Sequence, residues 1–253
     1  MKKVLYLFLL TSFISCNTSV SLEKSKELVR TGIAKERAKD YFGAIADYTK
    51  AIELNPNNVS AYGNRGNSKI NLKDYSGAML DFNKCIELKP NNSNSYGNRG
   101  VLKSKLKDYY GAIEDYSKAI ELDPREGIWY SNMGLLRDLL KDYDIAIICF
   151  SKAIELRLLE SDVPHNLKNG WHKPLTFNNI SAQIDALAKN YHYRSMTYEQ
   201  LGKTYEACKD LKEIQREYAA NYRLQFEGPR TIIDNQWKVG PQNLEKRINK
   251  LCN

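Results

Sequence analysis

Apolar and polar residues recur at helical spacing through most of this chain, and the pattern repeats every 34 residues. A small alanine marks the middle of each repeat, and a large aromatic residue follows it four positions later. A repeat of this length indicates a stack of similar helical units, because one unit cannot bury its apolar face alone. The pattern predicts an all-α fold. The alanines are Ala44, Ala78, Ala112 and Ala146, and the aromatic residues are Tyr48, Phe82, Tyr116 and Phe150.

Each unit is predicted to contain two helices, which in the second unit cover roughly residues 60–72 and 75–88. Gly66 and Ala78 fall where these helices would cross, so that the two backbones can approach closely. Asp74 precedes the second helix and is suited to cap it, because its carboxylate can accept hydrogen bonds from free backbone amides. The sequence therefore predicts a tightly packed helix–turn–helix unit.

These positions resemble the tetratricopeptide repeat family, whose pattern combines aromatic and small residues with a closing proline. The resemblance implies a right-handed α-solenoid of stacked helix–turn–helix repeats with a C-terminal capping helix. The first repeat departs from the pattern at Leu28, and the fourth has Leu158 in place of proline, so its second helix is expected to run on. The matching residues are Tyr62, Gly66, Ala78, Phe82, Cys85 and Pro90 in the second repeat, and Tyr96, Gly100, Ala112, Tyr116, Ala119 and Pro124 in the third.

The sequence divides into a signal, four repeats and a less regular C-terminal part. In the degenerate fifth repeat, Ser195 replaces the small glycine and Leu211 replaces the aromatic residue. The insertion before it is either a functional loop or a segment whose Trp171 packs on a neighbouring helix, and packing is favoured. A last helix over 242–251 is expected to cover the open end of the stack. The expected segments are 1–15 signal peptide, 16–24 tether, 25–58, 59–92, 93–126 and 127–160 repeats, 161–187 insertion, 188–217 fifth repeat and 218–253 cap.

The N-terminus combines two lysines, an eleven-residue apolar run over 4–14 and Ser15-Cys16. The run is too short to span a bilayer as a helix and is typical of a secretory signal. It resembles the bacterial lipoprotein signal, although Phe13 stands where leucine is usual. The resemblance implies that Cys16 is the lipid attachment site and that the protein is anchored in the bacterial cell envelope. Asn17 differs from the aspartate that retains some lipoproteins at the inner membrane, which slightly favours the outer membrane. The alternative is an ordinary cleaved signal with an incidental cysteine.

Charge and cysteine usage narrow the function classes. Loss of Lys2 and Lys3 with the signal would lower the formal net charge from +8 to +6. Acidic and basic residues are interspersed, which favours solvated helix faces over a nucleic-acid site. No two cysteines form a closely spaced pair. We expect Cys85 to be a buried thiol, since alanine holds this position in sister repeats, and a disulfide between Cys149 and Cys208 stays open as an alternative.

Catalytic and metal-binding motifs are not recognisable in this sequence. A site built on His165 and His172 would lack further ligands nearby, and we therefore expect no enzyme, cofactor, metal or small-molecule substrate. The favoured function is a membrane-anchored scaffold that binds a peptide or protein partner in the concave groove. One alternative is a structural subunit of an envelope assembly that uses its convex face or tail. A second is an enzyme or metal-binding protein with its site in residues 157–192.

The resemblance places four asparagines on the first helices of the repeats, facing the groove: Asn64, Asn67, Asn98 and Asn132. A carboxamide can donate and accept at once, so it can hold an extended peptide backbone. The alternative is that asparagine is common there in this family and serves no ligand. Gly63 and Ile128 stand where some family members have lysines that bind a C-terminal carboxylate, so that subtype is not favoured.

Three arginines occupy a position where the family normally has leucine, and an aspartate follows each of them sixteen residues later. In the fourth repeat both positions change together, to Met133 and Cys149, whereas the first repeat has Thr31 with Asp47. We therefore predict a structural ion pair between the two helices of one repeat. The predicted pairs are Arg65 with Asp81, Arg99 with Asp115, and Arg194 with Asp210.

Overall fold

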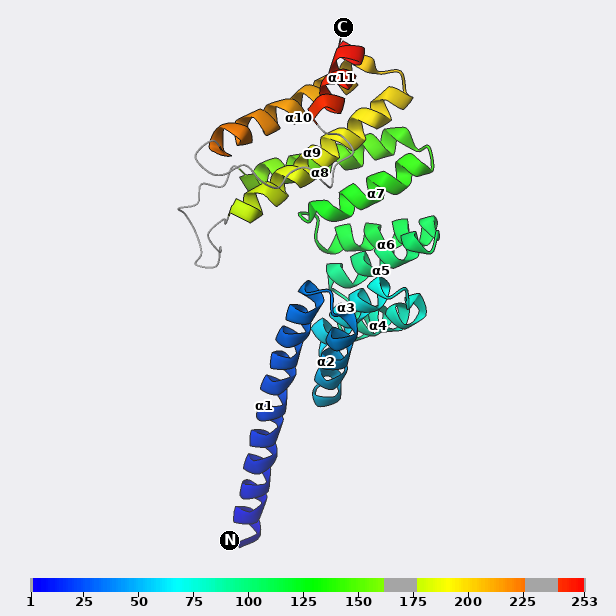
Figure 1. Ribbon diagram of the computed structural model, residues 1–253. Coiled ribbons are helices and arrows are strands. Elements are labelled where there is room, and N and C mark those ends of the chain that lie inside the picture. The colour runs from blue at the N-terminus through cyan, green and yellow to red at the C-terminus, as the bar shows by residue number, and fades with distance from the viewer. Residues whose placement is uncertain (1, 162–176, 226–240, 253) are drawn as a thin grey trace. The chain divides into compact units, whose positions relative to one another are not determined.

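The computed structural model describes residues 2–161, 177–225 and 241–252, and these residues are helical apart from short turns (Figure 1). Side chains are described over residues 20–158, 186–216 and 244–252. In chain order the helices are α1 (Lys2–Arg37), α2 (Tyr41–Leu54), α3 (Val59–Asn71), α4 (Tyr75–Leu88), α5 (Ser93–Lys105), α6 (Tyr109–Leu122), α7 (Gly127–Leu139), α8 (Tyr143–Ser161), α9 (Phe177–Gln200), α10 (Thr204–Gln225) and α11 (Pro241–Cys252).

Some predicted features fall outside this description. Most of the predicted insertion over 161–187, including His165, Trp171 and His172, lies outside the described residues. The side chain of Cys16 also lies outside them. Within the described residues, no helix combines the length and apolar character that a membrane crossing requires.

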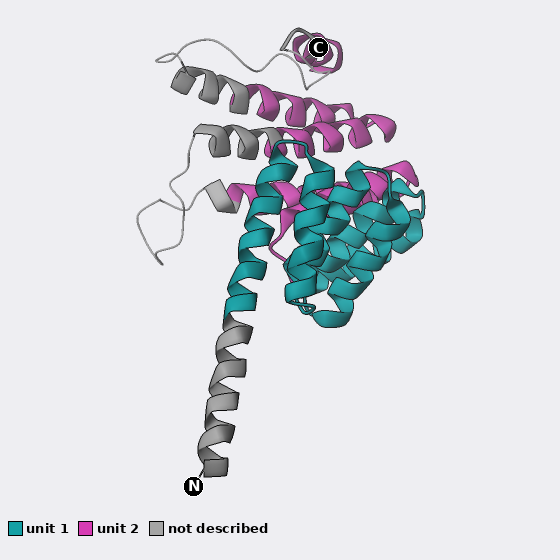
Figure 2. Ribbon diagram, turned by 60° about the horizontal axis from the view of Figure 1, so that its bottom comes forward, with its two compact units in different colours: residues 1–122 teal, residues 123–253 magenta. Residues whose placement is uncertain are grey.

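The chain forms two compact units, residues 1–122 and 123–253 (Figure 2). Unit 1 contains α1–α6, which are the first three repeats, and unit 2 contains α7–α11. We refer to the first helix of each repeat as helix A and the second as helix B. Each helix A packs antiparallel on its own helix B.

Unit 1 is a curved stack with its A helices on the inside. Helices α1, α3 and α5 contact one another in succession, and each B helix also contacts the A helix that follows it. Among the described residues of unit 1, the B helices make no such contacts with one another. The A helices therefore form the inner, concave layer, and the B helices α2, α4 and α6 form the outer layer.

A glycine and an aromatic ring hold the two helices of each repeat together. A Cβ atom added to Gly66 would lie 2.7 Å from the Phe82 ring, and one added to Gly134 would lie 2.7 Å from Phe150. Both aromatic side chains are fully buried. In the fifth repeat, Ser195 stands at the glycine position and is larger than glycine, while Leu211 stands at the aromatic position and is smaller than an aromatic residue. Both are fully buried. Close packing therefore fixes the summed size of the two residues.

The helix boundaries follow from local capping. The Asp74 carboxylate accepts a hydrogen bond from the Gly77 amide at 2.9 Å, which confirms its predicted role as an N-cap. Asp40 caps α2 in the same way. At the opposite end of the repeat, Asn58 and Asn92 cap α3 and α5 through their side-chain oxygens. These caps satisfy amides that would otherwise lack a partner at each helix start.

The first repeat begins earlier than the sequence suggested. Helix α1 is continuous from Lys2 to Arg37 and includes residues 16–24, which were expected to form a tether. The Ser21 hydroxyl donates to the Leu54 carbonyl at 3.0 Å, and the Ser25 hydroxyl donates to the Ala51 carbonyl at 2.8 Å. The Ser21 bond therefore fastens α1 to the end of α2 before the predicted repeat boundary at residue 25.

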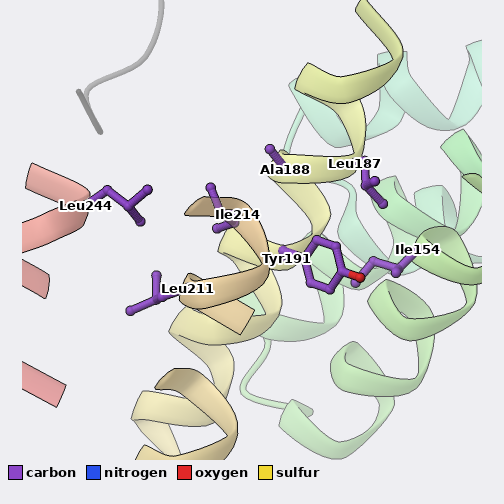
Figure 3. Packing of buried hydrophobic residues seen from close by; sticks show 7 residues of the cluster. All are labelled: Ile154, Leu187, Ala188, Tyr191, Leu211, Ile214 and Leu244. Atoms are coloured by element: carbon purple, nitrogen blue, oxygen red, sulfur yellow. The ribbon is translucent and has the colours of Figure 1, made fainter. Parts of the chain in front are cut away.

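Unit 2 ends in a helical cap. Helix α8 has 19 residues against 14 in α6, which confirms that the fourth repeat runs on without its proline. Helix α11 starts one residue before the predicted range. Its Leu244 packs in a cluster that α8, α9 and α10 share, with Ile248 and Leu251 beside it (Figure 3). The clustered residues are Ile154, Leu187, Ala188, Tyr191, Leu211, Ile214 and Leu244.

A disulfide between Cys208 and Cys252 joins α10 to the cap, with 5.4 Å between the two Cα atoms. The alternative pairing of Cys149 with Cys208 is wrong, because Cys149 is a free thiol. Cys149 occupies the helix B position that the buried aspartates hold in other repeats, and only 3% of its surface is exposed. Its side chain therefore lies within its own helix pair. Cys85 is buried as expected, and its thiol donates to the Val59 carbonyl at 3.4 Å.

Candidate functional site

The inner layer of unit 1 carries carboxamides that the fold does not use. Asn64 on α3 and Asn98 on α5 are half-buried, and their side chains form no hydrogen bond with any residue that the structure describes. Asn64 shares a stripe with Asn67 at helical spacing, on the side of α3 opposite to Gly66, which packs on α4. Gly63 adds no side chain beside this stripe. The inner face therefore presents unpaired donors and acceptors.

The fourth repeat in unit 2 presents a different surface at the same helix positions. Asn132 on α7 is also half-buried, and its side chain has no hydrogen bond within the described chain. Its neighbours along the stripe are Ile128, Leu135 and Leu139, with 45%, 37% and 57% of their surfaces exposed. The inner stripe of α7 is therefore largely aliphatic, whereas the stripe of α3 is polar.

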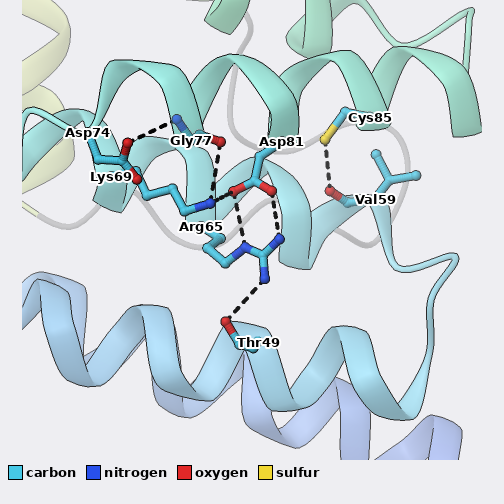
Figure 4. Close-up of polar contacts among 8 residues, drawn as sticks. All are labelled: Thr49, Val59, Arg65, Lys69, Asp74, Gly77, Asp81 and Cys85. Atoms are coloured by element: carbon cyan, nitrogen blue, oxygen red, sulfur yellow. Dashed lines mark hydrogen bonds and ion pairs between the residues drawn. The ribbon is translucent and has the colours of Figure 1, made fainter.

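All three predicted ion pairs are brought together in the structure. Arg65 binds Asp81 through two nitrogens, with an Nη2–Oδ1 distance of 2.7 Å and an Nε–Oδ2 distance of 3.0 Å (Figure 4). The corresponding distances are 2.6 and 2.9 Å for Arg99 with Asp115. They are 2.6 and 2.8 Å for Arg194 with Asp210. At most 4% of each aspartate is exposed, so these pairs belong to the core of the repeat.

Two of these carboxylates are each shared with a lysine that the sequence pattern had not singled out. The Nζ atom of Lys69 lies 2.8 Å from Asp81, and that of Lys103 lies 2.9 Å from Asp115. Lys69 also donates to the Gly77 carbonyl at 3.3 Å. The lysines precede their aspartates by twelve residues, a spacing that places them one turn after the arginines on helix A. That recurrence was the signal in the sequence.

In the first repeat, the buried aspartate of helix B is paired with helix A residues other than arginine. Asp47 accepts hydrogen bonds from Lys35 at 2.7 Å and from Thr31 at 2.9 Å. Burial opposes ionisation of Asp47, but these two hydrogen bonds outweigh it and hold the pKa of Asp47 below its usual value. Thr31 therefore fulfils part of the role that arginine has in the next two repeats.

Each arginine also reaches the repeat before its own. Arg65 donates from Nη1 to the Thr49 hydroxyl at 3.1 Å, and Arg99 donates to Asn83 at 2.9 Å. In unit 2, Arg194 donates to the Ser151 hydroxyl at 2.8 Å. One guanidinium thus connects its own helix pair to the preceding helix B. Its planar fork of donors suits this geometry better than an ammonium would. These residues form a structural ladder, not a ligand site.

A smaller polar cluster fastens the cap in unit 2. Arg247 on α11 forms an ion pair with Glu199 and donates to Nδ1 of His192 at 3.0 Å. Burial, and then the charge of Arg247, lower the pKa of His192. Among the described residues, no group of three histidine, cysteine or carboxylate side chains is arranged to hold a metal ion.

Comparisons with known proteins agree with the fold. Sequence models described as tetratricopeptide repeat match residues 93–126, and also 59–92 and 130–158. A model described as TPR repeat matches residues 38–72. No curated protein matches the chain.

Similar solved structures include MamA, which is 21% identical with a TM-score of 0.59, covering 76% of this chain and 96% of that one. MamA 41-end from Desulfovibrio magneticus RS-1 is 17% identical with a TM-score of 0.59, covering 78% and 96%. YrrB, described as a TPR protein with an unusual peptide-binding site, is 19% identical with a TM-score of 0.52, covering 79% and 91%. The chain therefore contains tetratricopeptide repeats and folds as stacked helix pairs of the TPR solenoid type.

Proposed function

We propose that this chain is a membrane-anchored scaffold that binds a peptide or protein partner on the inner faces of its A helices. The observation that carries the proposal is the free state of the Asn64 and Asn98 carboxamides within the described chain. A half-buried polar group that the fold leaves unpaired is available to a ligand. YrrB, a TPR protein with a peptide-binding site, supports the same use of this fold.

The chemistry of the surface favours an extended backbone as the ligand. Each carboxamide can donate to a peptide carbonyl and accept from a peptide amide. A direct hydrogen bond to a bound backbone typically contributes about 1 kcal/mol. Several such bonds give measurable affinity without specific side-chain pockets.

The triple variant Asn64→Ala, Asn98→Ala and Asn132→Ala tests this proposal. Because these side chains have no partner in the described chain, each substitution should change stability by under about 0.5 kcal/mol. We expect the variant to melt almost normally but to lose its partner in a pulldown from envelope extract. The matched control is Asn57→Ala with Asn91→Ala, which alters exposed asparagines in the turns.

The opposite outcome would make the asparagines structural. Normal capture by the triple variant, together with a large fall in melting temperature, would exclude the inner face as the binding surface. The interface would then lie on the convex surface or in residues 157–177. Trp171 would be the next residue to substitute.

The anchor is a separate part of the proposal and has its own test. We propose that Cys16 carries the lipid and holds the protein in the bacterial cell envelope, with the outer membrane slightly favoured. Two acyl chains are enough for stable anchoring, whereas one is marginal. Cys16→Ser should abolish metabolic labelling with a fatty acid and leave uncleaved precursor or soluble protein. Equal lipid label in variant and parent would show that Cys16 is not the attachment site.

A further inference from the structure

The turn between helix A and helix B places a lysine in the left-handed backbone region in each of the first four repeats. Glycine is the residue that adopts this conformation without steric cost, and a lysine side chain does not. In the fifth repeat, Gly202 holds the equivalent position with φ of 69°. Four of five repeats therefore carry a strained residue where the chain itself shows that glycine fits. The lysines are Lys39, Lys73, Lys107 and Lys141, with φ of 64°, 63°, 66° and 65°.

The fold does not use these lysine side chains. Lys39, Lys73 and Lys107 are exposed, and none of them forms an ion pair with a residue that the structure describes. By contrast, the lysines four residues earlier, Lys69 and Lys103, are paired with buried aspartates. The left-handed residue ends helix A, since Lys73 donates to the Ile70 carbonyl at 3.0 Å, but glycine would form the same backbone bond. Strain that recurs at this position without a side-chain contact points to a function for the strained side chain.

Unit 1 collects three of these turns at one end. Because its helices alternate in direction, the turns from A to B all lie at the same end of the stack. We name this end the basic turn edge, formed by residues 37–42, 71–76 and 105–110. Its exposed basic residues are Arg37, Lys39, Lys73, Lys105 and Lys107, its acidic residues are Asp40, Asp74 and Asp108, and its exposed apolar residues are Phe42, Leu106 and Tyr110.

Each of the three aspartates caps a helix B by accepting from a glycine amide and offsets part of the positive charge. Five exposed basic residues less three acidic residues leave this edge with a formal net charge of +2. Phe42 and Tyr110 have 76% and 72% of their surfaces exposed. At the other end of unit 1, Lys84 pairs with Glu87 and Lys118 with Glu121, whereas Lys50 and Lys89 are exposed and form no ion pair with a described residue. Among the described residues of unit 1, the two ends therefore differ in exposed aromatic surface.

We propose that the basic turn edge is a second interaction surface that binds an acidic segment of a partner protein containing apolar side chains. The free ammonium groups would pair with carboxylates, and Phe42, Leu106 and Tyr110 would contact the apolar residues. This surface is distinct from the inner face that carries the asparagines. Charge complementarity of this kind steers association as well as contributing affinity.

The position of the edge along α1 favours a protein over a lipid surface. From Val20 to Ala38, α1 rises by roughly 27 Å at 1.5 Å per residue. If Cys16 anchors the chain, the edge stands at the far end of α1 from the bilayer, and this step rests on the proposed anchor. An acidic protein segment can reach that position in any orientation of α1, whereas the anchoring membrane reaches it only if α1 lies along the bilayer surface.

Lysine acetylation followed by mass spectrometry tests the proposal on the full chain in neutral phosphatidylcholine vesicles. The probe is a synthetic peptide of repeating Glu-Glu-Leu triplets, with Gln-Gln-Leu as its uncharged counterpart. We expect the acidic peptide alone to slow acetylation of Lys39, Lys73 and Lys107 several-fold, with Lys50 and Lys89 unchanged. Unchanged rates, or equal slowing at all five lysines, would overturn the proposal. Protection by phosphatidylglycerol vesicles without peptide would also overturn it, in favour of a lipid site.

A glycine variant separates binding from folding. The change Lys39→Gly, Lys73→Gly and Lys107→Gly relieves the backbone strain, so the variant should be at least as stable as the parent and yet lose peptide binding. The control Lys24→Gln, Lys50→Gln and Lys89→Gln removes the same charge elsewhere and should bind normally. Equal peptide binding by the glycine variant, or equal loss in the control, would contradict a specific edge. The asparagine variant should retain this binding, so the two proposals fail independently.

Discussion

The third repeat in unit 1 buries Asp115 between Arg99 and Lys103, whereas the fourth repeat in unit 2 has Met133 and Cys149 at the positions of Arg99 and Asp115. Both repeats have a glycine, an alanine and an aromatic residue at the same positions, and both form an antiparallel helix pair. The shared packing therefore does not depend on the buried charge. Replacing both charged residues by residues without charge leaves neither member of the pair as an unpaired buried charge, which explains why the two positions change together. Arg137, at the position of Lys103, pairs instead with Asp142 at 2.9 Å.

The inner stripes of the two units also differ in their residues, although the packing between helices A and B is the same. On α3 and α5 the stripe carries Asn64 and Asn98, whereas on α7 three exposed aliphatic residues surround Asn132. None of these residues contributes to the crossing of helices A and B. Selection for a ligand can therefore alter the stripe of one unit without disturbing the packing of either.

The largest expected effect comes from removing a shared carboxylate. Asp115→Ala leaves Arg99 and Lys103 without their acidic partner in a half-buried site. We expect unit 1 to lose about 3 kcal/mol, the low end for a broken buried pair, because Arg99 keeps its bond to Asn83. Hydrogen exchange measured by mass spectrometry should show faster exchange in α5 and α6 and little change in unit 2.

A double variant that gives the third repeat the two uncharged residues of the fourth tests whether the charged residues act as a pair. Arg99→Met with Asp115→Cys should recover much of the loss, and part of it should remain because Lys103 loses its partner. The two single variants and the double variant form a double-mutant cycle. Simple additivity of the two losses would show that Arg99 and Asp115 do not stabilise the repeat as a pair.

Removal of the disulfide should cause the second large loss of stability, and only in unit 2. Cys252→Ser breaks a crosslink between residues 44 positions apart, which typically removes about 2–4 kcal/mol. We expect faster amide exchange in α10 and α11 and unchanged exchange in unit 1. A thiol reductant should reproduce this result in the parent and have no further effect on the variant. Faster exchange in α1–α6 after reduction would contradict this assignment.

Exchanging the packing pairs of the two units should give an intermediate effect. In unit 1 a Cβ atom on Gly100 would lie 2.9 Å from the Tyr116 ring. We therefore expect Gly100→Ser to cost about 1–3 kcal/mol through overpacking. Adding Tyr116→Leu reproduces the Ser195 and Leu211 combination of unit 2 and should recover part of the loss in chemical denaturation. Tyr116→Leu alone should destabilise unit 1 by leaving a cavity. A double variant that is less stable than both single variants would contradict the conclusion that packing fixes the summed size of the two residues.

These comparisons show which features a sequence can predict. Repeated positions such as Gly66 and Phe82 predicted the helix pair, because close packing constrains them in every copy. The ion pairs were predictable for the same reason, since Arg99 and Asp115 vary together between repeats. Features that occur once were not predictable. The pairing of Cys208 with Cys252 depends on where the cap docks, and no repeated spacing encodes that. The bonds from Arg247 to Glu199 and His192 depend on the same docking.

Mild acid should weaken the cap of unit 2 and spare unit 1. The pKa of His192 is lowered from its ordinary value of 6.5 by burial and by Arg247. A folded-state pKa below the unfolded one gives stability that is present above pH 6.5 and is lost as the pH falls through the folded pKa. The amides of α11 should therefore exchange faster at pH 5.5 than at pH 7.5 relative to those of α6. His192→Gln should remove most of this difference, and an unchanged difference would exclude His192 as its cause.

The smallest expected effect compares the turns of the two units. Lys73 in unit 1 and Gly202 in unit 2 occupy equivalent turns with φ of 63° and 69°. The left-handed conformation costs a lysine roughly 1–2 kcal/mol, and glycine loses about 0.5–1 kcal/mol more backbone entropy on folding. The net gain from Lys73→Gly should therefore be about 0.5–1 kcal/mol. Gly202→Lys should cost a similar amount, since a Cβ atom there meets no neighbour within 4 Å and only the backbone strain remains. Urea denaturation of each variant beside its parent measures both changes. If Lys73→Gly destabilised the protein, the lysine side chain would have to make a stabilising contact that outweighs its backbone strain, and the case for a free ammonium at the basic turn edge would fail.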